Sequence, residues 1–368
     1  MNTIVRNFIV CFILKIFYLL FLPLKVKRNQ IVFISYKGDK LEADFRLLSE
    51  ALEQKRNYQL RYVLIRYENN LLGNIKYLIN CLIQAYYMCT SKIVLLDYNN
   101  YVASTIHKKD VCVIQLWHAS GAVKKFGNDV TRQYRIKNYD YVISTSDVWK
   151  GPYSSAFNVQ ESQVISLGLP RNDCLNCMQT VNNYRNQVLK KYPKMKGKKI
   201  ILYAPTFRGN FFTGISYEKI DLDFIQKGLG NDYVIIYKLH PLLKDEKLSE
   251  NDFIINGNKD SIFKLMAAAD YLITDYSSIL FDYSILRRPI IGYVPDLKKY
   301  SLEVGTYMDY VQTMPFPSCY TEEEVVNTIM ENHFDLDRIE AFNQVYFKYH
   351  DSNSTQRIMS FIDQIIQG

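Results

Sequence analysis

Short runs of β-branched and aromatic residues alternate with helix-like stretches in the first half of the chain, from Gln30 onwards. Helices are expected at 41–55 and 70–89, the second carrying apolar residues such as Leu71, Ile75 and Ile79 at helical spacing. This alternation predicts a parallel sheet with helices on both faces. The expected strands are 30–35, 58–65, 92–97, 111–117, 139–145 and 162–168.

A second α/β pattern follows a basic, polar stretch at 182–199, which we interpret as a separator. The pattern predicts an α/β protein with two doubly wound, Rossmann-like halves facing a central cleft, where ligands lie beyond the carboxyl ends of the strands. Strands are expected at 199–207, 232–240, 252–256, 271–275 and 289–294. Helices are expected at about 221–229, 260–268, 278–287, 321–331, 337–348 and 354–366.

The pattern divides the chain into three parts: an apolar segment at 1–28, an N-terminal Rossmann-like domain at 29–181 and a C-terminal Rossmann-like domain at 182–368. The last helices are able to pack back on the N-terminal domain. A length of 368 residues also favours two domains.

The N-terminal segment is apolar from Phe8 to Leu24, is interrupted by Lys15, and is followed by the basic cluster KVKR at 25–28. A spanning helix needs roughly 20 uninterrupted apolar residues, and no small-x-small cleavage site of a signal peptide follows. The segment favours an anchor on the membrane surface with its basic end facing anionic lipid. The alternative is a helix buried against the domain.

Composition narrows the choice of partners. The net charge of +8 permits an anionic partner, but no nucleic-acid-binding module accompanies it, so we expect no nucleic acid. Of the seven cysteines, Cys174 and Cys177 form a CxxC without a second pair or a nearby histidine. We therefore expect no zinc site and a reducing cytosol.

Two of the five histidines end predicted strands, one in each half: His118 in QLWHASG and His240 in KLHP. Because ligands bind beyond the carboxyl ends of parallel strands, both imidazoles are expected to point into one cleft.

The segment 269–293 is the richest in candidate chemistry. Ser277 and Ser278 are expected to open a helix whose free N–H groups hold phosphate, with plain helix capping as the alternative. Asp282 lies one turn further on the same face. It is expected to accept a hydrogen bond from a ribose or acceptor hydroxyl, or only from Arg287 and Arg288.

Further candidates follow two other strands. Pro205, Thr206 and Arg208 come just after 199–203, and Arg208 is expected either to clamp a diphosphate bidentately or to form a surface salt bridge. Arg171, in GLPRND, is expected to reach the cleft. The DxD patterns at 221–223 and 335–337 are interpreted as helix starts, and no GxxxxGK[ST] or GxGxxG loop is present.

Five ordered segments, QLWHASGAVKKFG, GLPRND, ILYAPTFR, KLHP and ITDYSSILFDYSILRRPIIGYVPDLKKY, resemble the CDP-glycerol glycerophosphotransferase family, which primes and polymerises wall teichoic acids. The resemblance runs from about Gln30 to Gly305 and beyond. It implies a GT-B fold, association with the cytoplasmic face of the cell membrane, a CDP-polyol donor and no required metal or other cofactor. The sequence at 119–121, Ala-Ser-Gly, is closer to the shorter, primase-type members.

The resemblance implies that His118 is the catalytic base and that His240 contacts the donor phosphates. It implies donor binding by Pro205, Thr206, Arg208, Ser277, Ser278, Asp282 and Arg171. It implies acceptor binding by Gly121 and Lys124. The implied reaction transfers glycerol phosphate from CDP-glycerol to a hydroxyl of an undecaprenyl-diphosphate-linked saccharide or teichoic acid chain, with release of CMP.

Two alternatives remain open from the sequence. One is a GT-B glycosyltransferase that uses a nucleotide sugar to build a cell-surface polysaccharide, because fold does not determine function. The other is a non-catalytic membrane scaffold for wall assembly.

Overall fold

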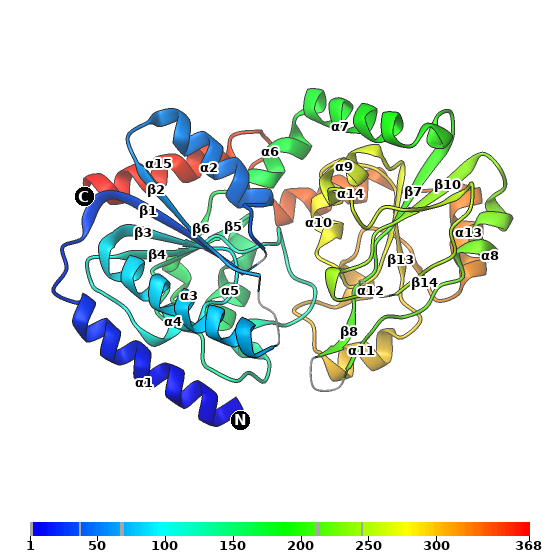
Figure 1. The fold of residues 1–368 in the computed structure, drawn as a ribbon. Helices are drawn as coiled ribbons and strands as arrows, with labels where there is room; N and C mark the ends of the chain where they lie inside the picture. The colour runs from blue at the N-terminus through cyan, green and yellow to red at the C-terminus, as the bar shows by residue number, and fades with distance from the viewer. Residues whose placement is uncertain (1–2, 37, 67–69, 211–213, 244–245) are drawn as a thin grey trace. The chain divides into compact units, whose positions relative to one another are not determined.

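A computed structural model describes residues 3–36, 38–66, 70–210, 214–243 and 246–368 (Figure 1). Contacts within the chain divide it into two compact units. The first contains residues 1–118, 126–173 and 353–368, and the second contains 119–125 and 174–352.

The contacts place the division differently from the sequence pattern. The chain passes from the first unit into the main part of the second unit after Asp173 rather than after residue 181. The short segment Ala119–Lys125 also belongs to the second unit. The last helix, α15 (Ser354–Gln367), belongs to the first unit and packs on α2 (Ala43–Lys55).

The first unit contains a parallel six-stranded sheet in the order β2-β1-β3-β4-β5-β6. The chain order reverses between β1 and β3, which makes the loops after these two strands the expected ligand-binding edge. The strands are β1 (Lys27–Ser35), β2 (Gln59–Leu64), β3 (Ser91–Leu96), β4 (Cys112–Gln115), β5 (Tyr141–Ser144) and β6 (Val164–Ser166).

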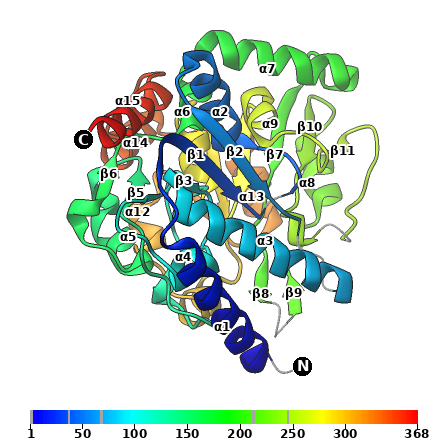
Figure 2. The same ribbon diagram turned by 60° about the vertical axis from the view of Figure 1, so that its left-hand side comes forward.

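Helices cover both faces of this sheet (Figures 1 and 2). Ile31 and Phe33 of β1 point to the face covered by α2 and α15, where Leu48 and Ile358 complete a fully buried core. The helices and short 3-10 turns of the first unit are α1 (Thr3–Phe21), α2, α3 (Leu71–Thr90), α4 (Tyr101–Thr105), η1 (Gly127–Asp129), η2 (Asp147–Trp149), α5 (Lys150–Phe157), η3 (Glu161–Gln163), α6 (Pro170–Asn176) and α15. Helix α6 continues past Asp173 into the second unit.

The second unit contains another parallel sheet, in the order β11-β10-β7-β12-β13-β14, and an antiparallel pair, β8 and β9. The order reverses between β7 and β12. The strands are β7 (Lys199–Tyr203), β8 (Arg208–Asn210), β9 (Gly214–Ser216), β10 (Tyr233–Tyr237), β11 (Ile254–Asn256), β12 (Tyr271–Thr274), β13 (Ile290–Tyr293) and β14 (Ser318–Cys319).

The core on one face of this sheet is formed by Ile201, Ile235 and Ile273, which pack with residues of α8 and α13. The helices and turns of the second unit are α7 (Met178–Lys191), η4 (Pro193–Met195), α8 (Leu222–Leu229), η5 (Pro241–Leu243), α9 (Ile262–Ala268), α10 (Ile279–Ser284), α11 (Leu297–Glu303), α12 (Tyr310–Thr313), α13 (Glu322–Glu331) and α14 (Leu336–Tyr346).

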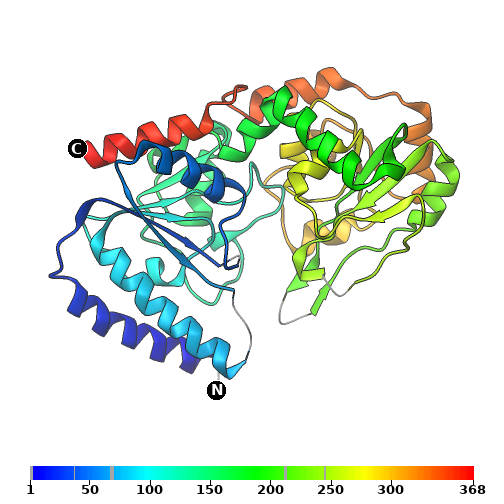
Figure 3. The same cartoon turned by 45° about the horizontal axis from the view of Figure 1, so that its top comes forward.

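The interpretation of 182–199 as a separator was wrong, because most of it lies in helix α7 (Figure 3). Val181 and Val188, seven residues apart, are buried on one face of α7, which packs on α9. Arg185 extends this contact by donating to the Ala268 carbonyl and to Asp270. Two buried apolar residues are too few to produce a recognisable helical periodicity in the sequence.

Within the described residues, no helix combines the length and the apolar character that crossing a bilayer requires.

Candidate active site

His118 follows the carboxyl end of β4 in the sheet of the first unit. The preceding residue, Trp117, has a left-handed backbone with φ of 62°, which turns the chain sharply. Gln115 holds this turn, because its side-chain oxygen accepts from the Trp117 N–H at 2.9 Å and its side-chain nitrogen donates to the Tyr98 carbonyl at 3.0 Å. No motif or periodic pattern in the sequence indicated this role of Gln115.

The hydrogen bond of the His118 ring determines its chemistry. Nδ1 lies 2.9 Å from the backbone carbonyl oxygen of Asp97, just after β3. A carbonyl oxygen only accepts, so Nδ1 carries the proton and Nε2 of the neutral ring carries the lone pair. His118 is therefore held in the tautomer that accepts a proton at Nε2.

Aromatic neighbours hold the plane of the His118 ring. Tyr98 stacks on it at 4.2 Å between centroids and 16° between planes, and the Trp117 ring lies 4.0 Å away. Trp117 in turn stacks on Phe126 at 4.8 Å. Burial raises the pKa of Tyr98 to about 12, so its hydroxyl stays protonated at neutral pH.

His240 follows β10 in the second unit and has the opposite hydrogen bond. Its Nδ1 accepts from the backbone N–H of Leu242 at 3.2 Å. In the neutral ring the proton is therefore on Nε2, which is a hydrogen-bond donor. The side chain is exposed, and its ring lies 4.7 Å from the ring of Phe207.

Arg208 does not form a simple surface salt bridge. Its Nε donates to Asp296 at 2.8 Å, and one terminal nitrogen donates to Asp275 at 2.8 Å and to the Thr206 carbonyl at 2.9 Å. Burial alone would lower the pKa of Arg208, but the hydrogen bonds that it donates to Asp296 and Asp275, and the negative charge of these carboxylates, raise it. Two carboxylates thus neutralise this guanidinium, and Arg208 organises the site more than it supplies positive charge.

The two carboxylates differ in their surroundings. Burial raises the pKa of Asp275, although Arg208 and Thr206 oppose this effect. Burial also acts to raise the pKa of Asp296, but the hydrogen bonds from Arg208 and Tyr276 outweigh it and lower the value. Removing the arginine would leave both acids uncompensated, which is the costly way to break a buried ion pair.

Two tyrosines complete the surroundings of Arg208. Tyr276 and Tyr300 stack at 3.8 Å between centroids, and the guanidinium lies 4.9 and 4.7 Å from their rings. The Tyr276 hydroxyl donates to Asp296 at 3.0 Å. Sequence reasoning missed the roles of these tyrosines and of Asp296, although they lie within the ITDYSS and VPDLKKY segments.

The segment Ala119–Lys125, directly after His118, is fixed within the second unit. The Val123 carbonyl accepts from Tyr307 N–H at 2.9 Å, and Lys125 N–H donates to the Gly305 carbonyl at 3.1 Å. The buried Ser120 hydroxyl donates to the buried carboxylate of Asp282 at 2.5 Å. Gly121 is also buried.

Lys124, on the same segment, is a cation of a different kind from Arg208. Its Nζ lies 4.6 Å from the centroid of the Phe207 ring. Burial lowers the pKa of Lys124, Arg208 adds to this effect and Asp275 opposes it. No carboxylate of the described residues forms an ion pair with it, so its charge is available to an anion.

Several hydroxyl groups lie on the loops after β7 and β12. Ser278 is the N-cap residue of α10, but its side chain makes no capping hydrogen bond, and Ser277 Oγ lies 3.5 Å from the Ile279 N–H. Thr206 Oγ1 is buried without a hydrogen-bond partner among the described residues. Side-chain capping by Ser278, the alternative explanation, is not observed. Pro205 is buried beside them.

The arginine pair after α10 does not bind Asp282. Arg287 pairs with Glu340 at 2.6 Å, and Arg288 donates to the carbonyls of Ala267 and Ala269 at 2.8 and 2.6 Å. These contacts stabilise the second unit. The helix itself covers six residues rather than the ten expected.

Arg171 has a structural partner within the first unit. Its Nε donates to Asp44 at 2.7 Å, its backbone N–H donates to the same carboxylate at 2.8 Å, and both side chains are buried. These contacts fix the start of α6 to α2. They give Arg171 a role that does not involve a nucleotide.

The DxD patterns are helix starts, as predicted: Asp221 and Asp335 accept from the backbone N–H of Phe224 and Arg338. In the described part of the chain, no group of three or more His, Cys, Asp or Glu is placed to hold a metal ion. Among the described cysteines, neither Cys174 nor Cys177 forms a disulfide.

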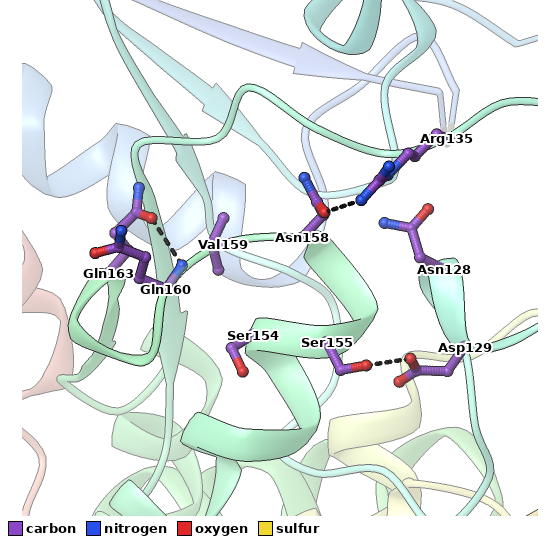
Figure 4. A pocket seen from close by; sticks show the side chains of 9 residues that line it. All are labelled: Asn128, Asp129, Arg135, Ser154, Ser155, Asn158, Val159, Gln160 and Gln163. Carbon is purple, nitrogen blue, oxygen red and sulfur yellow. Dashed lines mark hydrogen bonds between the residues drawn. The ribbon is translucent and has the colours of Figure 1, made fainter.

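A polar depression of 530 Å³ lies in the first unit (Figure 4). Many of its polar groups bond to one another; Arg135 donates to Asn158 at 2.7 Å, and Ser155 donates to Asp129. It contains none of the candidate residues. The lining residues are Asn128, Asp129, Arg135, Ser154, Ser155, Asn158, Val159, Gln160 and Gln163.

The model of the CDP-Glycerol:Poly(glycerophosphate) glycerophosphotransferase family matches residues 16–364, which is nearly the whole chain. The chain belongs to this family. The resemblance found in the sequence is thereby confirmed, and so is membership of a family of phosphotransferase enzymes.

Relatives within this glycerophosphotransferase family include enzymes for both polyols. A teichoic acid ribitol-phosphate primase of Bacillus spizizenii (strain ATCC 23059 / NRRL B-14472 / W23) is 33% identical over 364 residues, covering 93% of this chain and 93% of the relative. A teichoic acid glycerol-phosphate primase of Bacillus subtilis (strain 168) is 34% identical over 300 residues, covering 76% of each.

A solved structure of the wall teichoic acid polymerase TagF is similar to the chain with a TM-score of 0.74 and 26% sequence identity, covering 93% of this chain and 90% of that one. The predicted GT-B fold class is confirmed by this similarity.

Proposed function

We propose that this glycerophosphotransferase-family chain transfers a polyol phosphate from a CDP-polyol to a hydroxyl of a lipid-linked saccharide or teichoic acid acceptor and releases CMP. CDP-glycerol is the donor that the family description names. The observation that carries the proposal is the opposite hydrogen bonding of His118 and His240, which leaves a proton acceptor at one Nε2 and a proton donor at the other.

In the proposed reaction, His118 acts as general base. Its Nε2 takes the proton from the acceptor hydroxyl, whose oxygen attacks the phosphorus that carries the polyol. The bond from this phosphorus to the bridging oxygen breaks, and CMP leaves with that oxygen and its electron pair. A positioned base of this kind typically contributes 10²–10⁴-fold in rate.

The donor phosphates require positive charge and hydrogen-bond donors, because phosphoryl transfer depends mainly on positioning and charge stabilisation. In the second unit we assign this task to Lys124 and to the Nε2–H of His240. Both side chains contact the ring of Phe207. Ser277, Ser278 and Thr206 supply hydroxyls. Arg208 positions the loops after β7, β12 and β13 through Asp275 and Asp296.

In this proposal Lys124 binds the donor, whereas the family resemblance implied that it binds the acceptor. The reason is that the residues around it, Phe207, Arg208 and Asp275, lie on the two loops where the strand order of the second unit reverses. Gly121 is left as the acceptor-binding residue of the segment. Arg171 is left out of the donor site, because its guanidinium is bound to Asp44. The proposal uses protein cations and includes no metal or other cofactor.

The polyol is glycerol in this proposal, with ribitol as a second candidate. Ribitol is favoured by one observation: the relative that aligns over 93% of both chains is a ribitol-phosphate primase. The two donors share the cytidine diphosphate and differ only in the length and hydroxyl count of the polyol.

A donor panel tests the proposal. The purified chain would be incubated with CDP-glycerol, CDP-ribitol and UDP-sugars on a synthetic lipid-linked acceptor, with CMP release and product mass measured. We expect an added polyol phosphate from one CDP-polyol. Sugar transfer from a UDP-sugar would instead establish a glycosyltransferase, and no turnover with any donor would favour a scaffold.

A further inference from the structure

The segment Ala119–Lys125 is held at its far end by main-chain pairing. Its last residues form hydrogen bonds with the main chain of residues 305–307, in an antiparallel bridge between Lys124 and Thr306. These bonds require no particular side chain. They hold Lys124 in the second unit independently of the residues at the start of the segment.

The near end of the segment is held by a side chain instead. Ser120, two residues after His118, is fully buried, and its hydroxyl donates to the Asp282 carboxylate at 2.5 Å. Hydrogen bonds to an ionised carboxylate are stronger than those between neutral groups. Because alanine precedes it, Ser120 is the first residue after His118 whose side chain can form a hydrogen bond.

Asp282 lies on a helix, α10, that is itself fixed within the second unit. The neighbouring Ser284 exchanges two hydrogen bonds with Asn343 of α14: its hydroxyl donates at 2.6 Å, and its carbonyl accepts at 2.8 Å. The Asp282 side chain is buried, with only 4% of the residue exposed. A carboxylate so buried, and bonded to Ser120, is suited to hold the chain rather than to bind a ribose hydroxyl.

His118 therefore depends on two sets of contacts. Its ring is held within the first unit, by the Asp97 carbonyl at Nδ1 and by stacking on Tyr98. The chain passes into the second unit directly after His118, where the bond from Ser120 to Asp282 fixes the backbone. The first set determines the tautomer, and the second limits how far the backbone of the base can move.

We propose that Ser120 and Asp282 are positioning residues for His118, and that their hydrogen bond keeps the ring in its reactive orientation. The inference rests on the proposed function, in which His118 removes the acceptor proton. It gives Asp282 a different role from the donor binding that the family resemblance implied. Because a misplacement of about 1 Å can cost about 10²-fold in rate, the loss of this bond should appear in kcat.

Turnover at saturating CDP-polyol tests the proposal. Ser120→Ala and Asp282→Ala are each expected to lower kcat by roughly 10–10²-fold. The double variant should be about as slow as the slower single variant, because both changes remove the same bond. Asp282→Asn should lose less, since its amide oxygen can still accept from Ser120. The Kd for the donor, measured by titration calorimetry, should stay near wild type, because Lys124 is held by separate contacts.

Ser284→Ala is the matched control. It removes an equally buried serine hydroxyl on the same helix, one that bonds to Asn343 rather than to the segment after His118. We expect kcat near wild type, even where the unfolding temperature falls. A loss of kcat equal to that of Ser120→Ala would mean that any damage to α10 slows the enzyme, and would overturn the proposal.

A spectroscopic readout does not require turnover. With ¹⁵N-labelled histidine, of which the chain has five, the ring signals report which nitrogen of each histidine carries the proton. In Ser120→Ala, His118 is expected to change from the Nδ1–H form to exchange between both tautomers, because a displaced backbone draws the ring away from the Asp97 carbonyl. His240 should keep its Nε2–H signal. If wild type turns over no CDP-polyol, the proposed function fails, and this spectrum still decides the positioning role.

Three further results would overturn the proposal. A higher Kd for the donor in Asp282→Asn, with unchanged kcat, would make Asp282 a donor ligand. Losses that multiply in the double variant would mean that Ser120 and Asp282 act separately. Unchanged His118 signals in Ser120→Ala would mean that the base does not depend on this bond. If Asp282→Ala fails to fold, Ser120→Ala and the isosteric Asp282→Asn carry the same tests.

Discussion

His118 and His240 follow strands of similar sheets, yet the backbone gives them opposite properties. A carbonyl group faces Nδ1 of His118, whereas an N–H group faces Nδ1 of His240. The remaining nitrogen is thus a base in the first unit and a hydrogen-bond donor in the second. One histidine can therefore remove a proton while the other stabilises developing charge. In each case a single main-chain group determines which ring nitrogen carries the proton.

The largest effect is expected from replacing His118. His118→Ala is expected to lower kcat for CMP release by roughly 10²–10⁴-fold, because no base remains. His118→Gln should be no better, since an amide does not accept the proton. Affinity for CDP-glycerol, measured by titration calorimetry, should stay near wild type. His333→Ala is the control at an exposed histidine. Near-normal kcat in either His118 variant would remove the residue from the mechanism.

His240 should respond differently to the same pair of substitutions. His240→Ala is expected to lower kcat by roughly 10²–10³-fold, the usual cost of one donor to developing charge. His240→Gln should recover about tenfold of this loss, because the amide nitrogen of glutamine can replace the Nε2–H. If glutamine rescues at residue 118 and not at residue 240, the two assignments are reversed.

Lys124 is the residue at which donor binding is tested most directly. Lys124→Gln is expected to raise the Kd for CDP-glycerol roughly ten- to a hundredfold, from about 1.5–3 kcal/mol for a charged hydrogen bond. The unfolding temperature should change little, because Lys124 has no ion pair among the described residues. Lys125→Gln, at its exposed neighbour, is the matched control. Equal Kd values for the two variants would return Lys124 to the acceptor.

The smallest effect is expected at His107, a histidine whose partner is a carboxylate. The hydrogen bond that His107 Nε2 donates to the Asp140 carboxylate at 3.3 Å raises the pKa of His107, while burial opposes this effect. A raised pKa in the folded state stabilises the fold below the unfolded pKa of about 6.5, and this gain is lost as pH rises through the raised value. His107→Gln should cost about 0.2–1 kcal/mol near pH 5.5.

At pH 9 the same His107 variant and wild type should have the same free energy of unfolding, measured in urea. A cost that persists at pH 9 would mean that packing, not charge, explains the effect. Turnover should be unaffected at both pH values, in contrast to the two histidines above.

Local sequence pattern was enough to predict the strands of both parallel sheets, except β14, in their chain order. The strand at 30–35 lies within β1 (Lys27–Ser35), and the helix at 354–366 corresponds to α15. The pattern failed where local signals were weak. Helix α7 has only two buried residues, and β14 has only two residues in all.

The sequence predicted which loops carry the candidate site residues, but not the hydrogen-bond partners of these residues. Residues after β7, β10 and β12 could be located because loops at the carboxyl ends of parallel strands share one edge. Long-range partners could not be read from the chain. Arg208 binds Asp296, 88 residues away, and Ser120 binds Asp282, 162 residues away.

Motifs and local periodicity were sufficient to predict the family, the α/β alternation and the loops that carry the histidines. The folded chain was needed to show which nitrogen of each histidine bears the proton, which carboxylates neutralise Arg208, and that Leu71, Ile75 and Ile79 of α3 are exposed. Periodicity defines a stripe on a helix but not what covers it. Hydrogen-bond partners become known only when distant segments are brought together.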